Sequence, residues 1–268
     1  MKTRAITGFF FVAVMLASVL LGAYAFTLFF LILSVLSVEE FYRLVRTESV
    51  KPQKRWGLAL TISIYLPISL YFFKGEPLIY TLICVPLTIL ILIAELYRNH
   101  PNPFHNVAFT LFGVLYAAVP FCFFYGLAFT NGIYSCHYPL GFLLLLWASD
   151  TGAYLFGVNF GKHKLFERHS PKKTWEGFFG GMLTSAIVAI VLSFYFPELA
   201  LIHWIAISII IVAGGTLGDL SESMLKRSLS AKDSGTLLPG HGGILDRFDG
   251  LLLAAPLVFV YLKFIITF

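Results

Sequence analysis

Long apolar runs, separated by short polar segments, dominate the chain. Runs of about 17 to 25 apolar residues have the length that an α-helix needs to cross a bilayer. They do not alternate between apolar and polar positions, as the strands of a membrane β-barrel do. We therefore expect an all-α, polytopic membrane protein. The pattern predicts nine membrane helices, at 6–22, 24–43, 56–73, 78–97, 106–129, 138–160, 177–196, 200–226 and 248–267.

The first predicted helix has an alternative interpretation as a secretory signal. Lys2 and Arg4 precede its apolar run, and Ala23-Tyr24-Ala25 resembles a cleavage site. Another long apolar segment follows at once, which favours a retained helix. Cleavage would not alter the orientation of the remaining helices.

The composition supports a membrane protein of a single domain. Hydrophobic residues make up 58% of the chain and charged residues 12%, whereas charged residues make up about 25% of typical soluble domains. The polar loops are too short for an attached soluble domain. We expect one transmembrane domain over 1–268, in which helices of uncertain role (1–130) precede a catalytic half (138–268) with cytoplasmic loops at 161–176 and 227–247.

The basic residues predict the orientation. Of the 19 Lys and Arg residues, all but Lys74 and Lys263 fall on one side of the predicted helices. Because positive loops stay in the cytoplasm, we expect a cytoplasmic N-terminus, an external C-terminus and an active site facing the cytoplasm of a bacterial inner or cell membrane. The net charge of +5 then needs no nucleic-acid partner, and some of these bases suit anionic lipid head groups.

Charged residues inside the eighth span are candidates for function. Asp219, Glu222, Ser223 and Lys226 share one helix face, since three, four and seven residues separate them. An unpaired carboxylate at this depth costs several kcal/mol. The alternative interpretation is an internal Asp–Lys pair that only holds helices together.

A second acidic pair, Asp246 and Asp249, begins the ninth span at spacing i, i+3. Each acid suits a helix N-terminus, and for Asp249 capping or hydrogen bonding stays open beside metal ligation. Asp246 could face Asp219 across the two helices. Carboxylates that converge from two elements are typical of Mg²⁺ sites, so we expect Asp219, Asp246 and Asp249 as metal ligands.

The loop between these spans carries groups that suit phosphate. Lys226, Arg227 and Lys232 offer positive charge, and the segment Pro239-Gly240-His241-Gly242-Gly243 allows backbone amides to approach an anion. A glycine turn between helices is the alternative. His241 suits a general base, a phosphate donor or a turn residue.

The loop after the sixth span is similar. Asp150 lies near the inner end of that span, and Ser170-Pro171-Lys172-Lys173-Thr174 combines hydroxyls and bases at a predicted helix entrance, which suits a triphosphate. The alternative is that the bases of this loop only determine topology. Glu39, Glu40 and Glu95, near other inner helix ends, are expected to be solvated or snorkelling boundary residues.

Taken together, the polar residues of the C-terminal half resemble a family signature. The segments are Ser223-x-Leu225-Lys226-Arg227, Lys232-Asp233-x-Gly235, and Leu238-Pro239-x-His241-Gly242-Gly243-x-x-Asp246-Arg247-x-Asp249. This pattern resembles the signature of phosphatidate cytidylyltransferases, also called CDP-diacylglycerol synthases, and departs from it nowhere. Segments 150–157 and 170–177 are also similar to the family, while the first 130 residues match only as hydrophobic spans.

The resemblance implies an enzyme that joins CTP and phosphatidate to give CDP-diacylglycerol and pyrophosphate. It also implies Mg²⁺, a second cation such as K⁺, and a homodimer of nine-helix subunits. Asp219 and Asp246 become metal ligands, and the catalytic set includes Lys226, Arg227 and Lys232. The expected substrate contacts are Asp150, Ser170, Lys172, Lys173, Thr174, Ser223, Asp233, His241, Gly242 and Gly243.

The expected reaction is an in-line attack of the lipid phosphate on the α-phosphorus of CTP, for which positioning and charge neutralisation suffice. One rival from another class is a transporter, since intramembrane acids also mark ion pathways. Another is a CTP-using lipid kinase or a different lipid nucleotidyltransferase. A purely structural scaffold would not explain the paired acids.

Overall fold

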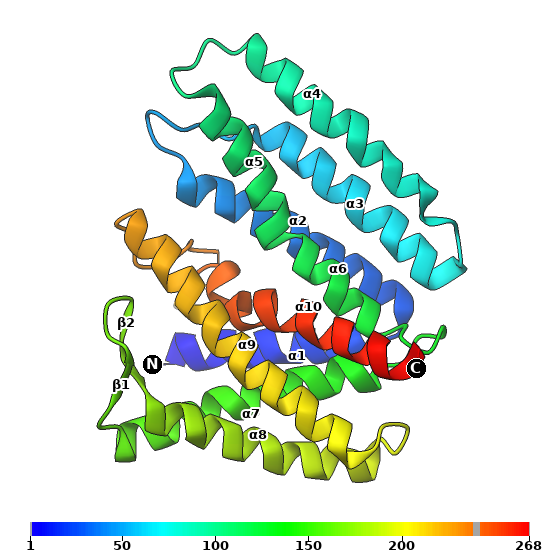
Figure 1. The fold of residues 1–268 in the computed structure, drawn as a ribbon, viewed down its shortest axis with the longest axis vertical. Helices are drawn as coiled ribbons and strands as arrows, with labels where there is room; N and C mark the ends of the chain where they lie inside the picture. Colours follow the sequence, from blue (N-terminus) through cyan, green and yellow to red (C-terminus); the bar gives the residue numbers. More distant parts are fainter. Residues whose placement is uncertain (1, 238–241, 268) are drawn as a thin grey trace. The chain divides into compact units, whose positions relative to one another are not determined.

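Ten α-helices, a 3₁₀ helix and one two-stranded hairpin make up the part of the chain that this computed structural model describes (Figure 1). It describes the backbone of residues 2–237 and 242–267, and the side chains of 7–237 and 242–266. The elements are α1 (Lys2–Leu20), α2 (Ala23–Val45), α3 (Lys54–Lys74), η1 (Leu78–Ile83), α4 (Cys84–Leu96), α5 (Pro103–Ala117), α6 (Val119–Leu127), α7 (His137–Phe160), β1 (Lys164–Phe166), β2 (Ser170–Thr174), α8 (Trp175–Tyr195), α9 (Leu201–Ser228) and α10 (Leu245–Thr267).

The all-α membrane fold predicted from the apolar runs is confirmed. Within the described residues, eight helical stretches are long and apolar enough to cross a bilayer, from Ala23–Val45 to Leu245–Ile266. The first predicted span is helix α1, whose described apolar part, Thr7–Leu20, is shorter than a crossing requires. Nine crossings and the orientation of the termini stay predictions.

Local structure differs from the hydropathy pattern at three places. In the predicted span 78–97, the 3₁₀ helix η1 precedes α4. The predicted span 106–129 is two helices, because α5 ends and α6 begins on either side of Ala118. Pro120 is the second residue of α6; proline lacks the amide hydrogen that a continuous helix needs, and its ring crowds the preceding turn. The loop 161–176 also holds the hairpin, in which β1 and β2 pair antiparallel with Phe166 opposite Ser170.

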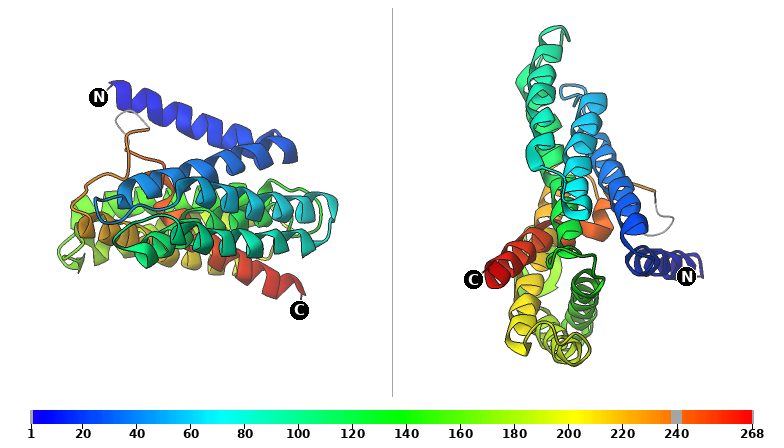
Figure 2. Two further views of the ribbon diagram at one scale, coloured as in Figure 1. Left: turned by 90° about the horizontal axis from the view of Figure 1, so that it is seen from above. Right: turned by 90° about the vertical axis from the view of Figure 1, so that its right-hand side faces the viewer.

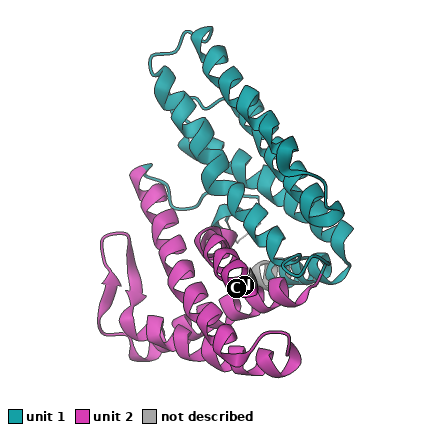
Figure 3. Cartoon of the chain, turned by 45° about the vertical axis from the view of Figure 1, so that its right-hand side comes forward, with its two compact units in different colours: residues 1–134, 229–247 teal, residues 135–228, 248–268 magenta. Residues whose placement is uncertain are grey.

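The chain divides into two compact units (Figure 3). Unit 1 comprises residues 1–134 and 229–247, and unit 2 comprises 135–228 and 248–268. The loop 229–247, which the sequence pattern assigned to the catalytic half, therefore belongs with the N-terminal helices. The boundary falls in the first turn of α10.

Aromatic side chains form the core of unit 1. In the same unit, α3 and α4 lie side by side (Figures 1 and 2). Phe26 packs on Phe30 with ring centroids 4.7 Å apart and stacks on Tyr125 at 5.6 Å. The Tyr125 hydroxyl lies 2.9 Å from Thr27 Oγ1. Offset aromatic contacts and interhelical hydrogen bonds orient helices in a bilayer, where lipid tails are as apolar as the side chains.

A polar cluster around Glu95 joins α3, α4 and α5 in unit 1. Glu95 accepts hydrogen bonds from Gln53 Nε2 at 2.6 Å and Asn106 Nδ2 at 2.6 Å, and it pairs with Arg98 at 2.8 Å. The residue is only 6% exposed. The expectation of a solvated boundary residue was wrong here, because the side-chain amides of Gln53, just before α3, and Asn106 of α5 replace water around the carboxylate.

Small residues allow the helices of unit 2 to pack closely. A Cβ on Gly181 of α8 would lie 2.8 Å from Ser149 O of α7, and a Cβ on Gly214 of α9 would lie 2.9 Å from Ala254 of α10. Close backbone approach through small residues is typical of membrane helix interfaces. These contacts hold the polar ends of the helices in a defined arrangement.

Candidate functional site

Three aspartates of unit 2 form what we call the aspartate cluster: Asp150 of α7, Asp219 of α9 and Asp249 of α10. Asp219, Asp150 and Lys173 of β2 lie within electrostatic range of Asp249. Three carboxylates thus share a region with the Lys173 ammonium group. Mutual repulsion among like charges makes such a cluster unfavourable unless cations offset it.

Asp219 is held by two side chains. Lys173 Nζ lies 2.7 Å from its Oδ2, and Ser223 Oγ donates to its Oδ1 at 3.2 Å. Lys173 Nζ also lies 3.5 Å from Thr216 O. Asp219 is therefore half of an Asp–Lys ion pair, as the alternative interpretation of the sequence proposed. Its partner is a lysine of the hairpin.

Lys226, predicted to contact polyphosphate, pairs with Glu222 one helical turn earlier, at 2.7 Å from Nζ to Oε2. Glu222 is 1% exposed, so this pair lies largely inside the protein. The Glu222–Lys226 and Asp219–Ser223 contacts both have i, i+4 spacing. They confirm that this segment is a helix with one polar face.

Asp249 is placed by the close approach of α9 and α10. The carbonyl oxygen of Asp249 occupies the space that a side chain at Gly218 would need, and Asp249 Oδ1 accepts the N–H of Gly250 at 2.7 Å. Because α10 begins at Leu245, Asp249 does not cap this helix. Hydrogen bonding and metal ligation remain as its two candidate roles.

Asp246 belongs to unit 1, where backbone amides hold its carboxylate. Ser234 N and Gly243 N donate to Asp246 Oδ2 at 2.9 and 2.8 Å. Gly242 adopts φ +83°, and a Cβ there would lie 2.5 Å from the same oxygen. The glycines expected to approach a phosphate thus make room for a carboxylate of the protein itself.

Glu40 of α2 is the residue that the sequence interpretation misjudged most. Its Oε1 accepts from Ser234 Oγ at 2.5 Å and from Leu245 N at 2.9 Å, and its Oε2 accepts from Ile244 N at 2.9 Å. It is 7% exposed, so the expectation of a solvated boundary residue was wrong. We call this arrangement the Glu40 cap, because it satisfies amides at the start of α10.

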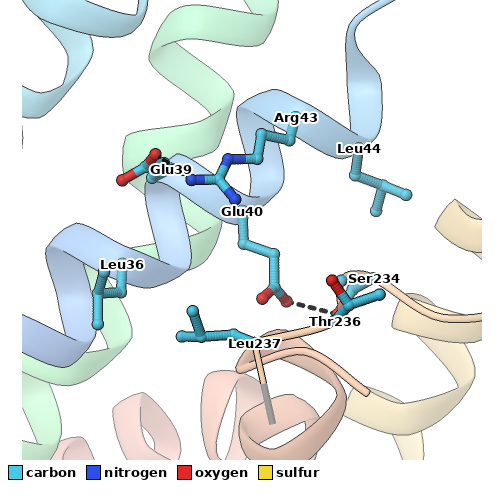
Figure 4. A pocket seen from close by; sticks show the side chains of 9 residues that line it. Leu36, Glu39, Glu40, Arg43, Leu44, Ser234, Thr236 and Leu237 are labelled. Carbon is cyan, nitrogen blue, oxygen red and sulfur yellow. Dashed lines mark hydrogen bonds and ion pairs between the residues drawn. The ribbon is translucent and has the colours of Figure 1, made fainter. Parts of the chain in front are cut away.

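A cavity of about 200 Å³ lies beside the Glu40 cap in unit 1 (Figure 4). Figure 4 shows Glu40 directed toward Ser234, whereas Glu39 lies beside Arg43. Glu39 also pairs with Lys54 at 2.6 Å. Adjacent acids on one helix therefore face different surroundings: Glu39 pairs with surface cations, and Glu40 accepts internal donors. The lining comprises Leu36, Glu39, Glu40, Arg43, Leu44, Ser234, Gly235, Thr236 and Leu237.

The other residues predicted to contact substrate differ in exposure and in structural role. Thr174 is buried and accepts the N–H of Gly177 at 3.2 Å, which caps α8 and confirms the helix entrance predicted there. Ser170 is half-buried, whereas Lys172, Arg227, Lys232 and Asp233 are exposed. His241 lies outside the described residues. Within the described part of the chain, no group of three or more His, Cys, Asp or Glu side chains has the arrangement of a metal site.

Comparison with known proteins identifies the family. The model of the cytidylyltransferase family matches residues 2–265. Phosphatidate cytidylyltransferases of Staphylococcus haemolyticus (strain JCSC1435) and Staphylococcus aureus (strain COL) are 36% identical over 264 residues and 35% identical over 266 residues. Each alignment covers 98% of this chain and 99% of the relative. The chain therefore belongs to the cytidylyltransferase family, as the motifs of its C-terminal half indicated.

Proposed function

We propose that this protein transfers the cytidylyl group of CTP to phosphatidate, giving CDP-diacylglycerol and pyrophosphate. The aspartate cluster carries the proposal, because it gathers three acids of membrane helices near a lysine of the hairpin. Such a mixture suits a metal-bound polyphosphate. The full-length relatives named phosphatidate cytidylyltransferase support the same reaction.

The oxygen donors of the cluster suit Mg²⁺ in their chemistry, although among the described residues the three acids do not have the arrangement of a metal site. Asp219 and Asp249 offer carboxylate oxygens from two helices, with Asp150 as a third acid and Lys173 as a nearby base. Hard divalent cations prefer oxygen ligands, and an excess of negative charge favours them. When bound, Mg²⁺ would neutralise phosphate oxygens of CTP. Asp246 as a further ligand, and K⁺ as a second cation, stay predictions.

The protein's own groups would position the substrates. An oxygen of the lipid phosphate attacks the α-phosphorus of CTP; that bond forms while the bond from the α-phosphorus to the pyrophosphate oxygen breaks. Lys172, Lys173, Arg227 and Lys232 would offset the charge of the phosphates. A phosphate monoester dianion is already nucleophilic, so the step needs no general base.

We place this site at the cytoplasmic side of the membrane and expect a homodimer. The Lys and Arg distribution supports the orientation, and cytosolic CTP must reach the site while the lipid tails stay in the bilayer. Exposed apolar side chains on the membrane helices, such as Phe179, Leu183 and Ile187 of α8, suit contact with acyl chains.

The reaction is tested with purified protein, phosphatidate, Mg²⁺ and each nucleoside triphosphate in turn. We expect pyrophosphate and CDP-diacylglycerol with CTP. Release of CDP together with a phosphorylated lipid would instead indicate a kinase. If neither product forms, but solute enters proteoliposomes that contain the protein, the enzyme proposal is wrong.

A further inference from the structure

We propose that Glu40 is a positioning residue for Asp246, holding residues 234 and 243–246 in the conformation that presents this carboxylate. The proposal rests on the function proposed above, in which Asp246 belongs to the reaction centre. It assigns a role to the N-terminal helices, for which the sequence pattern indicated none. Glu40 itself is not expected to contact substrate.

The acceptor pattern of the Glu40 cap requires a carboxylate. Its two oxygens receive three donors: the Ser234 hydroxyl and two backbone amides, of Ile244 and Leu245. An ionised carboxylate accepts at both oxygens, whereas a carboxamide presents N–H₂ at one of them. Hydrogen bonds to a charged acceptor at a helix N-terminus are also strong ones.

Ser234 links this cap directly to Asp246. Its hydroxyl donates to Glu40 and accepts the N–H of Asp246 at 3.3 Å, while its own backbone N–H donates to Asp246 Oδ2 at 2.9 Å. The amide of Gly243 donates to Asp246, and the next two amides along the chain donate to Glu40. The Asp246 and Glu40 carboxylates thus accept hydrogen bonds from consecutive backbone amides at the start of α10. Loss of one carboxylate should therefore disturb the backbone that holds the other.

Two glycines provide an independent indication that the loop is built around Glu40. A Cβ on Gly243 would overlap Glu40 Oε1 and Ser234 Oγ, and a Cβ on Gly235 would lie 2.7 Å from Glu40 Oε2. Only residues without a side chain fit against the carboxylate at both positions. An acid roughly 200 positions earlier in the chain therefore explains why glycine occupies these two positions of the loop.

The experiment compares Glu40→Gln with Glu39→Gln in the purified full-length protein. Glu39 is a matched control, because it neighbours Glu40 but pairs with Arg43 and Lys54. For Glu40→Gln we expect turnover to fall about tenfold or more, and half-maximal activity to require about tenfold more Mg²⁺, as for other residues that support metal ligands. Glu39→Gln should stay within about twofold of the unchanged protein, as exposed pairs contribute little.

A second measurement does not depend on activity. Hydrogen exchange of the amides in 242–246, followed without Mg²⁺ or substrates, should be faster in Glu40→Gln and unchanged in Glu39→Gln. If the unchanged protein makes no CDP-diacylglycerol, the proposed function fails while this measurement still tests the cap. Unaltered exchange together with unaltered Mg²⁺ dependence in Glu40→Gln overturns the positioning role.

Ser234→Ala covers the case in which Glu40→Gln does not fold. This change removes the hydroxyl shared by Glu40 and Asp246 but leaves both carboxylates in place. We expect a smaller shift of Mg²⁺ dependence in the same direction, with faster exchange at Asp246 N. A variant indistinguishable from the unchanged protein in both measurements would contradict the proposal.

Discussion

Lys173 of the hairpin strand β2 forms an ion pair with Asp219 of α9, with 2.7 Å between Nζ and Oδ2. The side chains are 26% and 37% exposed, so water still reaches the pair. The lysine predicted to contact a phosphate is therefore a counter-ion of the aspartate predicted to bind a metal. Lys173 thus belongs both to the proposed phosphate contacts and to the surroundings of the proposed metal ligand.

Replacing this lysine tests that connection. Lys173→Gln removes the charge beside Asp219, and we expect kcat/KM for CTP to fall by about 10- to 100-fold. Because the pair is partly solvated, its loss should change the free energy of unfolding by less than about 1 kcal/mol. Steady-state kinetics and thermal unfolding measure both effects. Lys164→Gln in strand β1 is the control, and equal activity of the two variants would contradict the assignment.

Neutral replacement of the acids tests the metal ligands. Asp219→Asn and Asp246→Asn should abolish turnover at every Mg²⁺ concentration while the protein stays folded. Asparagine is chosen at Asp246 because its oxygen still accepts from Ser234 N and Gly243 N, whereas alanine would leave these donors unsatisfied at about 1–3 kcal/mol. Product formation and size-exclusion profiles are measured beside Glu167→Gln, an exposed acid of the hairpin turn. Substantial activity in either Asn variant overturns the assignment.

A double-mutant cycle tests the fit between Gly243 and Glu40. Gly243→Ala places a methyl group where the Glu40 carboxylate lies, so we expect a loss of stability of about 1–3 kcal/mol. In a Glu40→Ala background the same change should cost less, because most of the obstructing atoms are gone. The coupling should exceed about 0.5 kcal/mol, measured by denaturant unfolding in detergent. Additive effects would indicate that the two residues do not compete for space.

The buried Glu95 cluster should matter for stability and not for chemistry. Glu95→Ala removes the acceptor of Asn106 Nδ2, one of two acceptors of Gln53 Nε2 and the ion-pair partner of Arg98, so we expect the free energy of unfolding to fall by about 2 kcal/mol or more. Activity per folded molecule should stay within about twofold of the unchanged protein. Glu95 is not among the residues proposed to bind substrate or metal, so its loss should act through stability. Thermal unfolding and specific activity are the measurements, with Glu48→Ala in the exposed loop after α2 as control. An unchanged midpoint would show that the cluster contributes little.

Much of the site was accessible from local patterns. The polar face of α9 follows from helical spacing, and the contacts between Asp219 and Ser223 and between Glu222 and Lys226 confirm it. The entrance of α8 was predicted from Ser170–Thr174, and Thr174 caps it. The family was evident from the polar residues of the C-terminal half alone. The first two inferences depend on residues within about two helical turns of one another, and the third depends on short segments of nearly consecutive residues.

Other partnerships required the folded chain. Sequence spacing does not indicate that Lys173 pairs with Asp219, 46 positions later by residue number, or that Glu95 collects side-chain amides from two other segments. The hairpin and the break before Pro120 also escaped the hydropathy pattern. Hydropathy averages over many residues and does not resolve a short strand pair or a single turn.

The sequence by itself determined the membrane-helical class, the family and the residue types available for the chemistry, because apolar run length and helical spacing are local properties of the chain. Only the tertiary structure decided which acids are solvated and which are structural. Glu39 and Glu40 are adjacent, yet one meets surface cations and the other meets Ser234, Ile244 and Leu245. A buried carboxylate is stable only where donors replace its water, and here packing brings those donors from the far end of the chain.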